Sequence, residues 1–387
     1  MVINHSPNIL KVDGKIITDT RDIVEAFNKY FIEVCQTYLV NNQHNNCDTF
    51  PEVRKYVNAK LPQGETFNIP RVTEQYVLKY LQSLDPNKAT GLDEISAHVL
   101  KISAIEITPS ITRIINQSID TDVFPCNWKE AKVIPSFKTE SRHDLSNYRP
   151  IAILPILSKI IEKHVHLALS KHLNKFDLLR NTQSGFREKH SCETALLKVV
   201  DQWMESIDKG YILGTVFLDL SKAFDLVNHE IMVTKLRIYG VSSKAINWFK
   251  SYLVNRSQCT YLNGVLSSSR RIACGVPQGS ILGPLLFLIY INDIDLTLEY
   301  CSADMYADDT TFYASDTSTI NLNNKLQRDM EKVSAWCDRN KMAINTTKTK
   351  VLLMGSGQRL ASLPDNANTL SVTLGAKFSR LSNMKNY

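Results

Sequence analysis

The chain has 387 residues, 43% of them apolar and 22% charged, and its 45 basic and 39 acidic residues give a net charge of +6. This composition is typical of a globular protein with more than one domain; it excludes a disordered chain, and its mild positive charge permits a polyanionic partner. Eight single cysteines without a CxxC pair predict free thiols, and the lack of a signal peptide or membrane span predicts an intracellular protein with no membrane partner.

Helical periodicity dominates the first half of the chain. Apolar residues recur on one face in residues 18–34, whereas residues 36–70 are rich in asparagine and predict a loop. A second helix is expected around residues 77–84, followed by a turn-rich joint at 87–95. The sequence then predicts a strand at 132–137 and amphipathic helices at 155–173 and 193–207.

After residue 210 the pattern changes to strands alternating with helices. The β-branched apolar run 212–220 predicts a buried strand, and helices are expected at 229–239 and 243–253. A hairpin, a turn rich in glycine and proline, and a helix ending near Asn292 come next. The last predicted elements are a hairpin at MYADDT (305–310), a helix at 321–340 and a strand at 349–355. This mixture of hairpins and helices favours the α+β class.

Three carboxylates stand at places where acids are costly. Asp219 closes the apolar strand, and Asp308 and Asp309 occupy the tip of the MYADDT hairpin. A buried acid at a strand end is unfavourable unless it is paired or binds a metal, and Mg²⁺ accepts one or two carboxylates together with phosphate oxygens. Two ions held roughly 3.5–4 Å apart can serve a phosphoryl-type transfer. The alternative for an isolated Asp-Asp pair is an ordinary solvated turn.

The order of the surrounding motifs resembles a known family. FLDLSKAFD (217–225), GVPQGS (275–280) and YADD (306–309) are similar, in that order, to motifs A, B and C of reverse transcriptases. The neighbouring residues resemble the non-LTR (LINE-type) retrotransposon group, with the jockey-like clade nearest. The likeness extends to KATGLDEI (88–95), NYRPIAILPILSKIIEK (147–163), QSGFREKHSCETAL (183–196) and WCDRNKMAINTTKTKVLLMG (336–355).

The resemblance implies a right-hand polymerase fold of the α+β class, whose palm is an antiparallel sheet backed by helices. It implies an N-terminal helical extension at 1–85, fingers at 86–210, a palm with the catalytic motifs at 211–355, and a degenerate tail at 356–387. The thumb is expected to be truncated, and the endonuclease of such elements is not in this sequence. The chain is therefore expected to be a fragment of a longer polyprotein.

The resemblance also assigns catalytic roles. Asp219 and Asp308 match the main metal ligands, Asp309 matches an assisting acid, and the backbone carbonyl of Leu220 matches an additional metal ligand. Lys348 stands where motif D has a candidate general acid for the leaving pyrophosphate, because a lysine beside a phosphate can donate a proton. The alternative for Lys348 is a surface lysine.

Substrate-binding roles follow in the same way. Gln278 and Gly279 match the motif B residues that contact the incoming nucleotide, and glycine permits close approach of the backbone. Lys138 and Arg149 match finger residues that bind the triphosphate, for which their charges are suited. Arg187 is expected to contact the template backbone. The alternative for each basic residue is a solvated side chain.

The activity implied is that of an RNA-directed DNA polymerase. It extends a DNA 3′-hydroxyl on an RNA template with dNTPs and two Mg²⁺ ions, with Mn²⁺ as a substitute, and its partners are the RNA template and a DNA primer or RNA–DNA hybrid. Phe224 matches the bulky residue that excludes a ribose 2′-hydroxyl, which argues against an RNA-dependent RNA polymerase; otherwise it is a core residue. A second alternative is a nucleic-acid-binding remnant without useful catalysis. The family's mode of insertion implies the nucleus as well as the cytoplasm.

Overall fold

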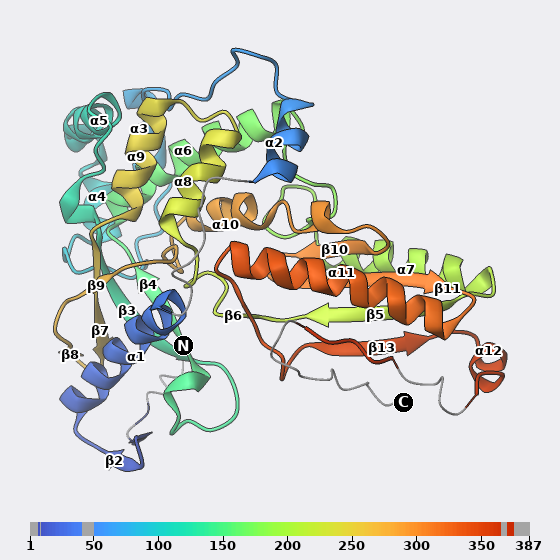
Figure 1. Ribbon diagram of the computed structural model, residues 1–387. Helices are drawn as coiled ribbons and strands as arrows, with labels where there is room; N and C mark the ends of the chain where they lie inside the picture. The colour runs from blue at the N-terminus through green and yellow to red at the C-terminus, as the bar shows by residue number, and fades with distance from the viewer. Residues whose placement is uncertain (1–6, 8, 41–49, 365–369, 375–387) are drawn as a thin grey trace. The chain divides into compact units, whose positions relative to one another are not determined.

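The computed structural model describes residues 7, 9–40, 50–364 and 370–374, and it divides into two compact units. Unit 1 consists of Met1–Gln43, Leu61–Phe176 and Asn228–Leu286, and unit 2 of His44–Lys60, Asp177–Val227 and Phe287–Tyr387. Each unit combines segments that are distant in the sequence. Figure 1 labels the helices and strands of both units.

Unit 1 is built on a twisted sheet with the order β4-β3-β7-β8, to which β9 adds by pairing with β7. β3 and β4 form an antiparallel hairpin, and β3 also pairs in parallel with β7. Helix α1 packs on this sheet and buries Phe27 against Tyr148, with the ring centroids 4.8 Å apart. The strands are β3 (Glu130–Phe137), β4 (Tyr148–Ile153), β7 (Arg256–Leu262), β8 (Val265–Leu266) and β9 (Arg270–Ile272), and a small hairpin is formed by β1 (Leu10–Val12) and β2 (Lys15–Ile17).

The remaining helices of unit 1 gather in one group, which lies above the sheet in the view of Figure 1. Trp248 and Tyr252 of α9 are fully buried, and Phe124 packs edge-on against both rings. This aromatic cluster packs α9 against the segment that follows α5. The helices are α1 (Thr20–Val40), α3 (Glu74–Gln82), α4 (Ala97–Ile102), α5 (Ala104–Asp120), α6 (Ile156–Lys175), α8 (His229–Ile238) and α9 (Ser243–Leu253); α10 (Gly283–Ile291) crosses the boundary between the units.

Unit 2 contains a four-stranded antiparallel sheet with the order β10-β11-β5-β13. Its strands are β5 (Ile212–Leu218), β10 (Ser302–Tyr306), β11 (Asp309–Asp316) and β13 (Lys350–Met354). A two-stranded sheet of β6 (Leu220–Ser221) and β12 (Ala343–Ile344) continues from the end of β5. The sheet is covered on both faces by helices, as expected for a strand such as β5 that is buried along nearly its whole length.

Helices α11 (Thr319–Arg339) and α7 (Cys192–Asp208) cover opposite faces of this sheet (Figure 1). Ser318 caps α11, whose apolar stripe is fully buried. Trp203 of α7 packs edge-on against Phe217 and Tyr313, whose side chains point to the face of the sheet opposite α11. Unit 2 also contains α2 (Pro51–Asn58) and α12 (Gly357–Ala361). The buried stripe of α11 consists of Leu322, Leu326, Met330 and Val333.

Most of the predicted elements are present, but α4, the long helix α5 and β4 were not predicted. The predicted loop at 36–70 is wrong at its start, because α1 continues to Val40. It is also wrong for Pro51–Asn58, which forms α2 because Val53 and Val57 are fully buried on one face. The hairpin of β1 and β2 was not predicted, and neither was α12 in the polar tail. The mixed α/β structure with antiparallel sheets agrees with the predicted class.

Two of the compositional predictions can be checked. The cysteines whose side chains the structure describes are free thiols, as predicted, whereas Cys47 lies outside the described residues. Within the described part of the chain, no helix combines the length and the apolarity needed to cross a bilayer. The free thiols are Cys126, Cys192, Cys259, Cys274, Cys301 and Cys337.

Candidate active site

Strand pairing in unit 2 brings the predicted acids together at one end of the sheet. Leu218 of β5 pairs with Thr310 of β11 in an antiparallel register. The next position on each strand places Asp219 opposite Asp309. Asp308 precedes Asp309 in the turn of the β10–β11 hairpin, so all three acids lie at the same end of neighbouring strands. Two segments about ninety residues apart in the sequence thus meet at this end of the sheet.

The backbone of Asp219 is held by the segment that resembles motif D. Its N–H donates to Oγ1 of Thr349 (3.2 Å), and its carbonyl accepts from the N–H of Asn345 (2.8 Å). Lys348 is exposed and immediately precedes Thr349, so its backbone lies beside Asp219. Leu220 is buried and pairs with Ile344 of β12. The structure therefore places Asp219, Leu220 and Lys348 in one neighbourhood.

The turn that carries Asp308 is tight and strained. Tyr306 pairs with Asp309, which leaves only Ala307 and Asp308 as the loop. Ala307 has φ +59°, a left-handed conformation that costs a residue with a Cβ about 1–2 kcal/mol. Asp308 is half-buried and Asp309 is exposed. Two-residue hairpins often have glycine at such a position, so this turn must be held by its surroundings.

The acids suit a hard divalent cation that also binds substrate phosphates. Among the described residues, no group of three or more His, Cys, Asp or Glu side chains is arranged to hold a metal by itself. Mg²⁺ does not require such a cage, because it is usually held by one or two carboxylates plus phosphate oxygens and water. Asp219 and the Asp308–Asp309 pair supply oxygen donors of this kind, and the set therefore fits the predicted metal.

Phe224 lies in an aromatic stack a few residues after Asp219. Its ring stacks on Phe287 with the centroids 4.2 Å apart and an interplanar angle of 22°. Phe186 approaches the same ring edge-on at 6.1 Å and is 53% exposed. Phe224 itself is half-buried, so packing fixes the orientation of the ring while part of it remains accessible. Both the packing role and the predicted steric role are compatible with this arrangement.

Arg187 braces the loop in which it lies. Its Nη1 donates to the backbone carbonyls of Arg180 (2.8 Å) and Gln183 (3.1 Å). The guanidinium is half-buried, and these two bonds use only one of its nitrogens. The predicted contact of Arg187 with the template remains a prediction.

Sequence reasoning missed Gln183, which is only 1% exposed. Its side-chain amide makes hydrogen bonds with both the N–H and the carbonyl of Ala307, at the turn that carries Asp308. The motif QSGFR contains Gln183 and could have pointed to it, but the motif was used only to predict the role of Arg187. An isolated glycine such as Gly185 can mark a close approach of another backbone segment, which is here the backbone of Ala307.

Motif B forms a loop in unit 1 that lies against β4. The carbonyl of Gln278 accepts from the N–H of Ala152 (2.7 Å). Gly279 has φ +124°, and a Cβ at this position would collide with the carbonyl oxygen of Ala152. The two predicted nucleotide-binding residues are therefore fixed to the sheet of unit 1 by a contact that only glycine allows.

Lys138 and Arg149 come from the β3–β4 hairpin and point to the same side of it. Arg149 pairs with Ser136, two residues before Lys138, and side chains at i and i+2 share a face. Both basic side chains are exposed, whereas Phe137 and Tyr148 point to the opposite face, into the core of unit 1. The structure thus places the two predicted phosphate-binding cations together on β3–β4, whose second strand also holds the motif B loop.

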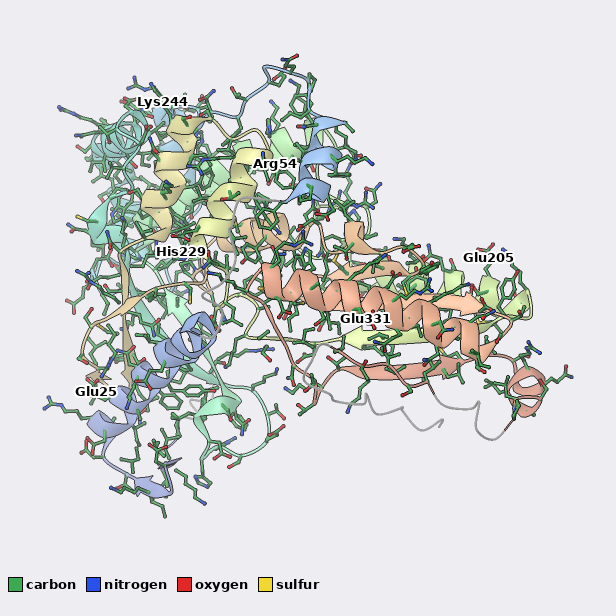
Figure 2. All side chains as sticks on the ribbon, viewed as in Figure 1. Glu25, Arg54, Glu205, His229, Lys244 and Glu331 are labelled. Carbon is green, nitrogen blue, oxygen red and sulfur yellow. The ribbon has the colours of Figure 1, made fainter. Side chains whose placement is uncertain are left out.

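One half-buried and one fully buried titratable group contact the motif B loop. Nε2 of His229 (Figure 2) donates to the carbonyl of Gly275 (2.8 Å), and burial lowers the pKa of this imidazole. Glu162 of α6 is fully buried and accepts from the N–H of Ile281 (2.8 Å); burial raises the pKa of its carboxyl. This contact gives His229 a structural role in the loop.

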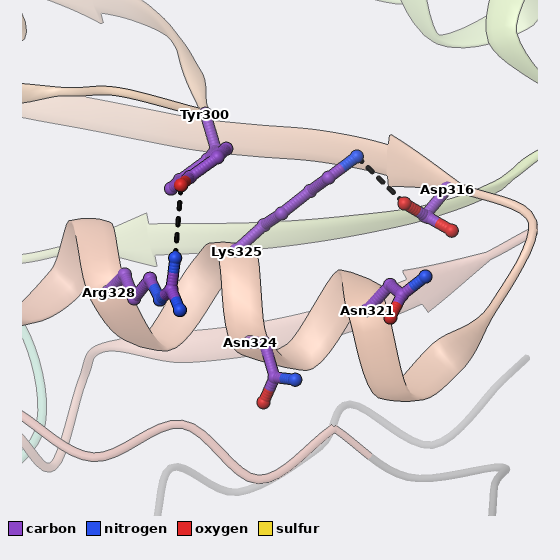
Figure 3. Close-up of a pocket in the computed structure, with 6 residues that line it drawn as sticks. All are labelled: Tyr300, Asp316, Asn321, Asn324, Lys325 and Arg328. Atoms are coloured by element: carbon purple, nitrogen blue, oxygen red, sulfur yellow. Dashed lines mark hydrogen bonds and ion pairs between the residues drawn. The ribbon is translucent and has the colours of Figure 1, made fainter.

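A separate hollow of about 240 Å³ lies on the surface of unit 2 (Figure 3). Lys325 pairs with Asp316 (2.8 Å), and Arg328 donates to the hydroxyl of Tyr300 (3.0 Å). Asp316 is the last residue of β11, whereas Asp309 is its first. The hollow therefore lies at the opposite end of the strand from the acids and does not belong to the candidate active site.

Comparison with protein families matches the chain to one family. The model described as reverse transcriptase (RNA-dependent DNA polymerase) matches residues 138–375, more than half of the chain and all three acids. The chain belongs to the reverse transcriptase family. This confirms the family predicted from the order of motifs A, B and C.

Curated relatives place the chain near mobile elements of insects. It is 29% identical over 310 residues to the RNA-directed DNA polymerase from mobile element jockey of Drosophila melanogaster, covering 77% of this chain and 33% of that protein. It is 27% identical over 333 residues to the probable RNA-directed DNA polymerase from transposon BS of the same species, covering 82% and 36%. The jockey protein of Drosophila funebris is 28% identical over 288 residues, covering 72% and 31%. The chain thus spans about a third of the length of these relatives.

Proposed function

We propose that this chain carries the nucleotidyl-transfer centre of an RNA-directed DNA polymerase from a non-LTR retrotransposon. It would extend a DNA 3′-hydroxyl on an RNA template with dNTPs. One observation carries the proposal: the register of β5 and β11 brings Asp219 opposite Asp309 and beside the turn that holds Asp308. Carboxylates gathered from separate strands at a sheet end are costly unless they bind cations.

The cofactor we propose is Mg²⁺, bound as two ions, with Mn²⁺ as a substitute. Asp219 and Asp308 would hold the ions, with Asp309 and the carbonyl of Leu220 as additional ligands. When bound, such ions activate an attacking hydroxyl and stabilise a leaving pyrophosphate. Lys348 would donate a proton from its Nζ to the leaving pyrophosphate. Its exposed position beside the segment that anchors Asp219 supports this role.

The remaining roles concern substrates. Lys138 and Arg149 would bind the triphosphate of the dNTP, and Gln278 and Gly279 would contact the nucleotide itself. Arg187 would contact the template backbone. The pairing of the two cations on one face of β3–β4 supports the first role, because phosphate groups are bound best by several converging charges.

The architecture we propose is that of a right-hand polymerase, with fingers and a palm. The fingers would comprise residues 86–210 and the palm residues 211–355, after an N-terminal extension at 1–85 and before a tail at 356–387. The antiparallel sheet of unit 2, with α11 on one of its faces, supports the assignment of the palm. We propose action in the nucleus and the cytoplasm on an RNA template paired with a DNA primer.

Primer extension tests the proposal directly. The purified chain is incubated with primed poly(rA), Mg²⁺ and dTTP, and the same assay is made with Asp308→Ala. The matched control is Asp316→Ala, which removes an acid from the opposite end of the same strand. Extension by the wild type and the control but not by Asp308→Ala supports a polymerase.

The same experiment separates the alternatives. Absence of extension with retained binding of the primed template supports a nucleic-acid-binding remnant. With primed poly(dA) or poly(rA), the pair dUTP and UTP differs only in the 2′-hydroxyl, so it isolates sugar selection. Preference for UTP would contradict the role proposed for Phe224 and favour an RNA polymerase.

A further inference from the structure

We infer that Gln183 is a positioning residue for the active site, because its side-chain amide fixes the turn that carries Asp308. This inference rests on the proposed polymerase function. No direct contact of Gln183 with substrate or metal is needed for it. The contacts involved lie within unit 2, between residues 180–187 and the β10–β11 hairpin.

The two ends of the Gln183 amide bind both polar groups of one backbone residue. Oε1 accepts from the N–H of Ala307 (2.9 Å), and Nε2 donates to the carbonyl of Ala307 (3.1 Å). Oε1 also accepts from the N–H of Gly185 (2.7 Å), which fixes the orientation of the amide itself. Because Gln183 is 1% exposed, water cannot easily replace these bonds.

The backbone around Gln183 is attached to the same hairpin. The N–H of Met305 donates to the carbonyl of Thr182 (2.8 Å), and the N–H of Ser184 donates to the carbonyl of Met305 (2.8 Å). Gln183 is thereby aligned in parallel with β10 and reaches along it toward the turn. Four hydrogen bonds in total join residues 182–184 to residues 305–307.

The segment is in turn fixed to the body of unit 2. The half-buried Arg180 and the hydroxyl of Thr182 both donate to Oδ2 of the buried Asp295, at 2.8 and 2.9 Å. Nη1 of Arg187 adds a contact within the segment by donating to the carbonyl of Gln183 (3.1 Å). The amide therefore has a rigid base, which is the requirement for a group that positions another.

These hydrogen bonds matter for the acids because they hold the backbone next to Asp308. Ala307 has φ +59° without being glycine, and Asp308 is the next residue. A turn in this conformation persists only where its surroundings determine it, and the Gln183 amide makes two hydrogen bonds to Ala307. Loss of the amide should let the turn relax and move the carboxylate of Asp308, and small displacements of reacting groups are expensive in rate.

The test compares Gln183→Ala and Gln183→Glu with a matched control. Glutamate is nearly isosteric and keeps the acceptor for Ala307 while losing the donor. The control is Gln327→Ala, because the amide of Gln327 also bonds both the N–H (2.8 Å) and the carbonyl (3.4 Å) of one backbone residue, Thr373, away from the hairpin. Circular dichroism and thermal melting establish that each variant is folded.

Two measurements then decide the inference. Hydrogen exchange of the Ala307 amide should accelerate in Gln183→Ala, much less in Gln183→Glu, and not at all in Gln327→Ala. In primer extension, kcat should fall about 100-fold in Gln183→Ala, with the KM for dTTP nearly unchanged. Gln183→Glu should also lose kcat, because it cannot donate to the carbonyl of Ala307, and the control should match the wild type.

Several results would overturn the inference. Unchanged exchange at Ala307 in Gln183→Ala shows that the amide does not hold the turn. Accelerated exchange of the Ala307 amide in Gln183→Ala, with kcat within about twofold of the wild type, shows that catalysis does not depend on fixing the turn. A loss of activity that appears equally in Gln327→Ala reflects general instability. If the wild type does not extend primers, the proposed function fails by itself, and exchange at Ala307 still decides whether Gln183 fixes the turn.

Discussion

Gly185 offers the sharpest test of how closely the turn that carries Asp308 is supported. A Cβ at this position would lie 2.8 Å from Cα of Ala307 and closer still to its nitrogen. Carbon atoms pack at about 3.5–4.0 Å, so an alanine must displace the turn or its support by about 1 Å. A displacement of that size at a reacting group can cost about 100-fold in rate, and Gly185→Ala should lower kcat for dTTP incorporation by about that factor.

The matched control for this change is Gly357→Ala. Gly357 is also in unit 2, has no atom within 4 Å of the added methyl group, and is not in the left-handed region. It should be neutral or slightly stabilising, since alanine reduces the freedom of the unfolded chain. Primer extension and thermal melting are compared for both variants. A Gly185→Ala enzyme with kcat near that of the wild type would refute the claim that the turn has no room to move.

Three further expectations can be tested with the same preparations. Asp308→Asn should lose about 10²–10³-fold in kcat, and Asp309→Asn, at an exposed position, should lose less; equal losses in primer extension would contradict this division. Phe224→Val should raise incorporation of UTP relative to dUTP, by up to about the 100-fold that a pocket gains from excluding one hydroxyl, as measured by competitive incorporation. Burial lowers the pKa of His229, so its contribution to stability should be complete above about pH 6.5 and decline at lower pH; urea unfolding should show this decline in the wild type and not in His229→Gln.

The sequence was sufficient to place each acid at the end of a strand, because that signal is local. Asp219 ends a β-branched apolar run, and Asp308 follows a strand-like segment, so each could be placed at a strand end. The structure adds the register, in which Leu218 faces Thr310. Register depends on long-range pairing between segments far apart in the chain, which no local pattern specifies.

Short elements were harder to predict for a related reason. Pro51–Asn58 forms α2 within a segment that lacks strong periodicity, and its apolar face consists of only Val53 and Val57. Helices of eight residues are marginal by themselves and depend on packing that the sequence does not show. The hairpin of β1 and β2 has the same character, with three residues in each strand.

The support of the active site was the least predictable part, although it is composed of ordinary residues. Gln183 has no charge and no distinctive spacing, and its importance depends on the distance between its amide and Ala307. A sequence shows which residues can bind a metal, since carboxylates are rare in apolar segments. It does not show which amide satisfies a buried backbone N–H, because many polar residues could. Residues that position catalytic acids are therefore found by following the hydrogen bonds of the turn, starting from Asp308 and moving outward.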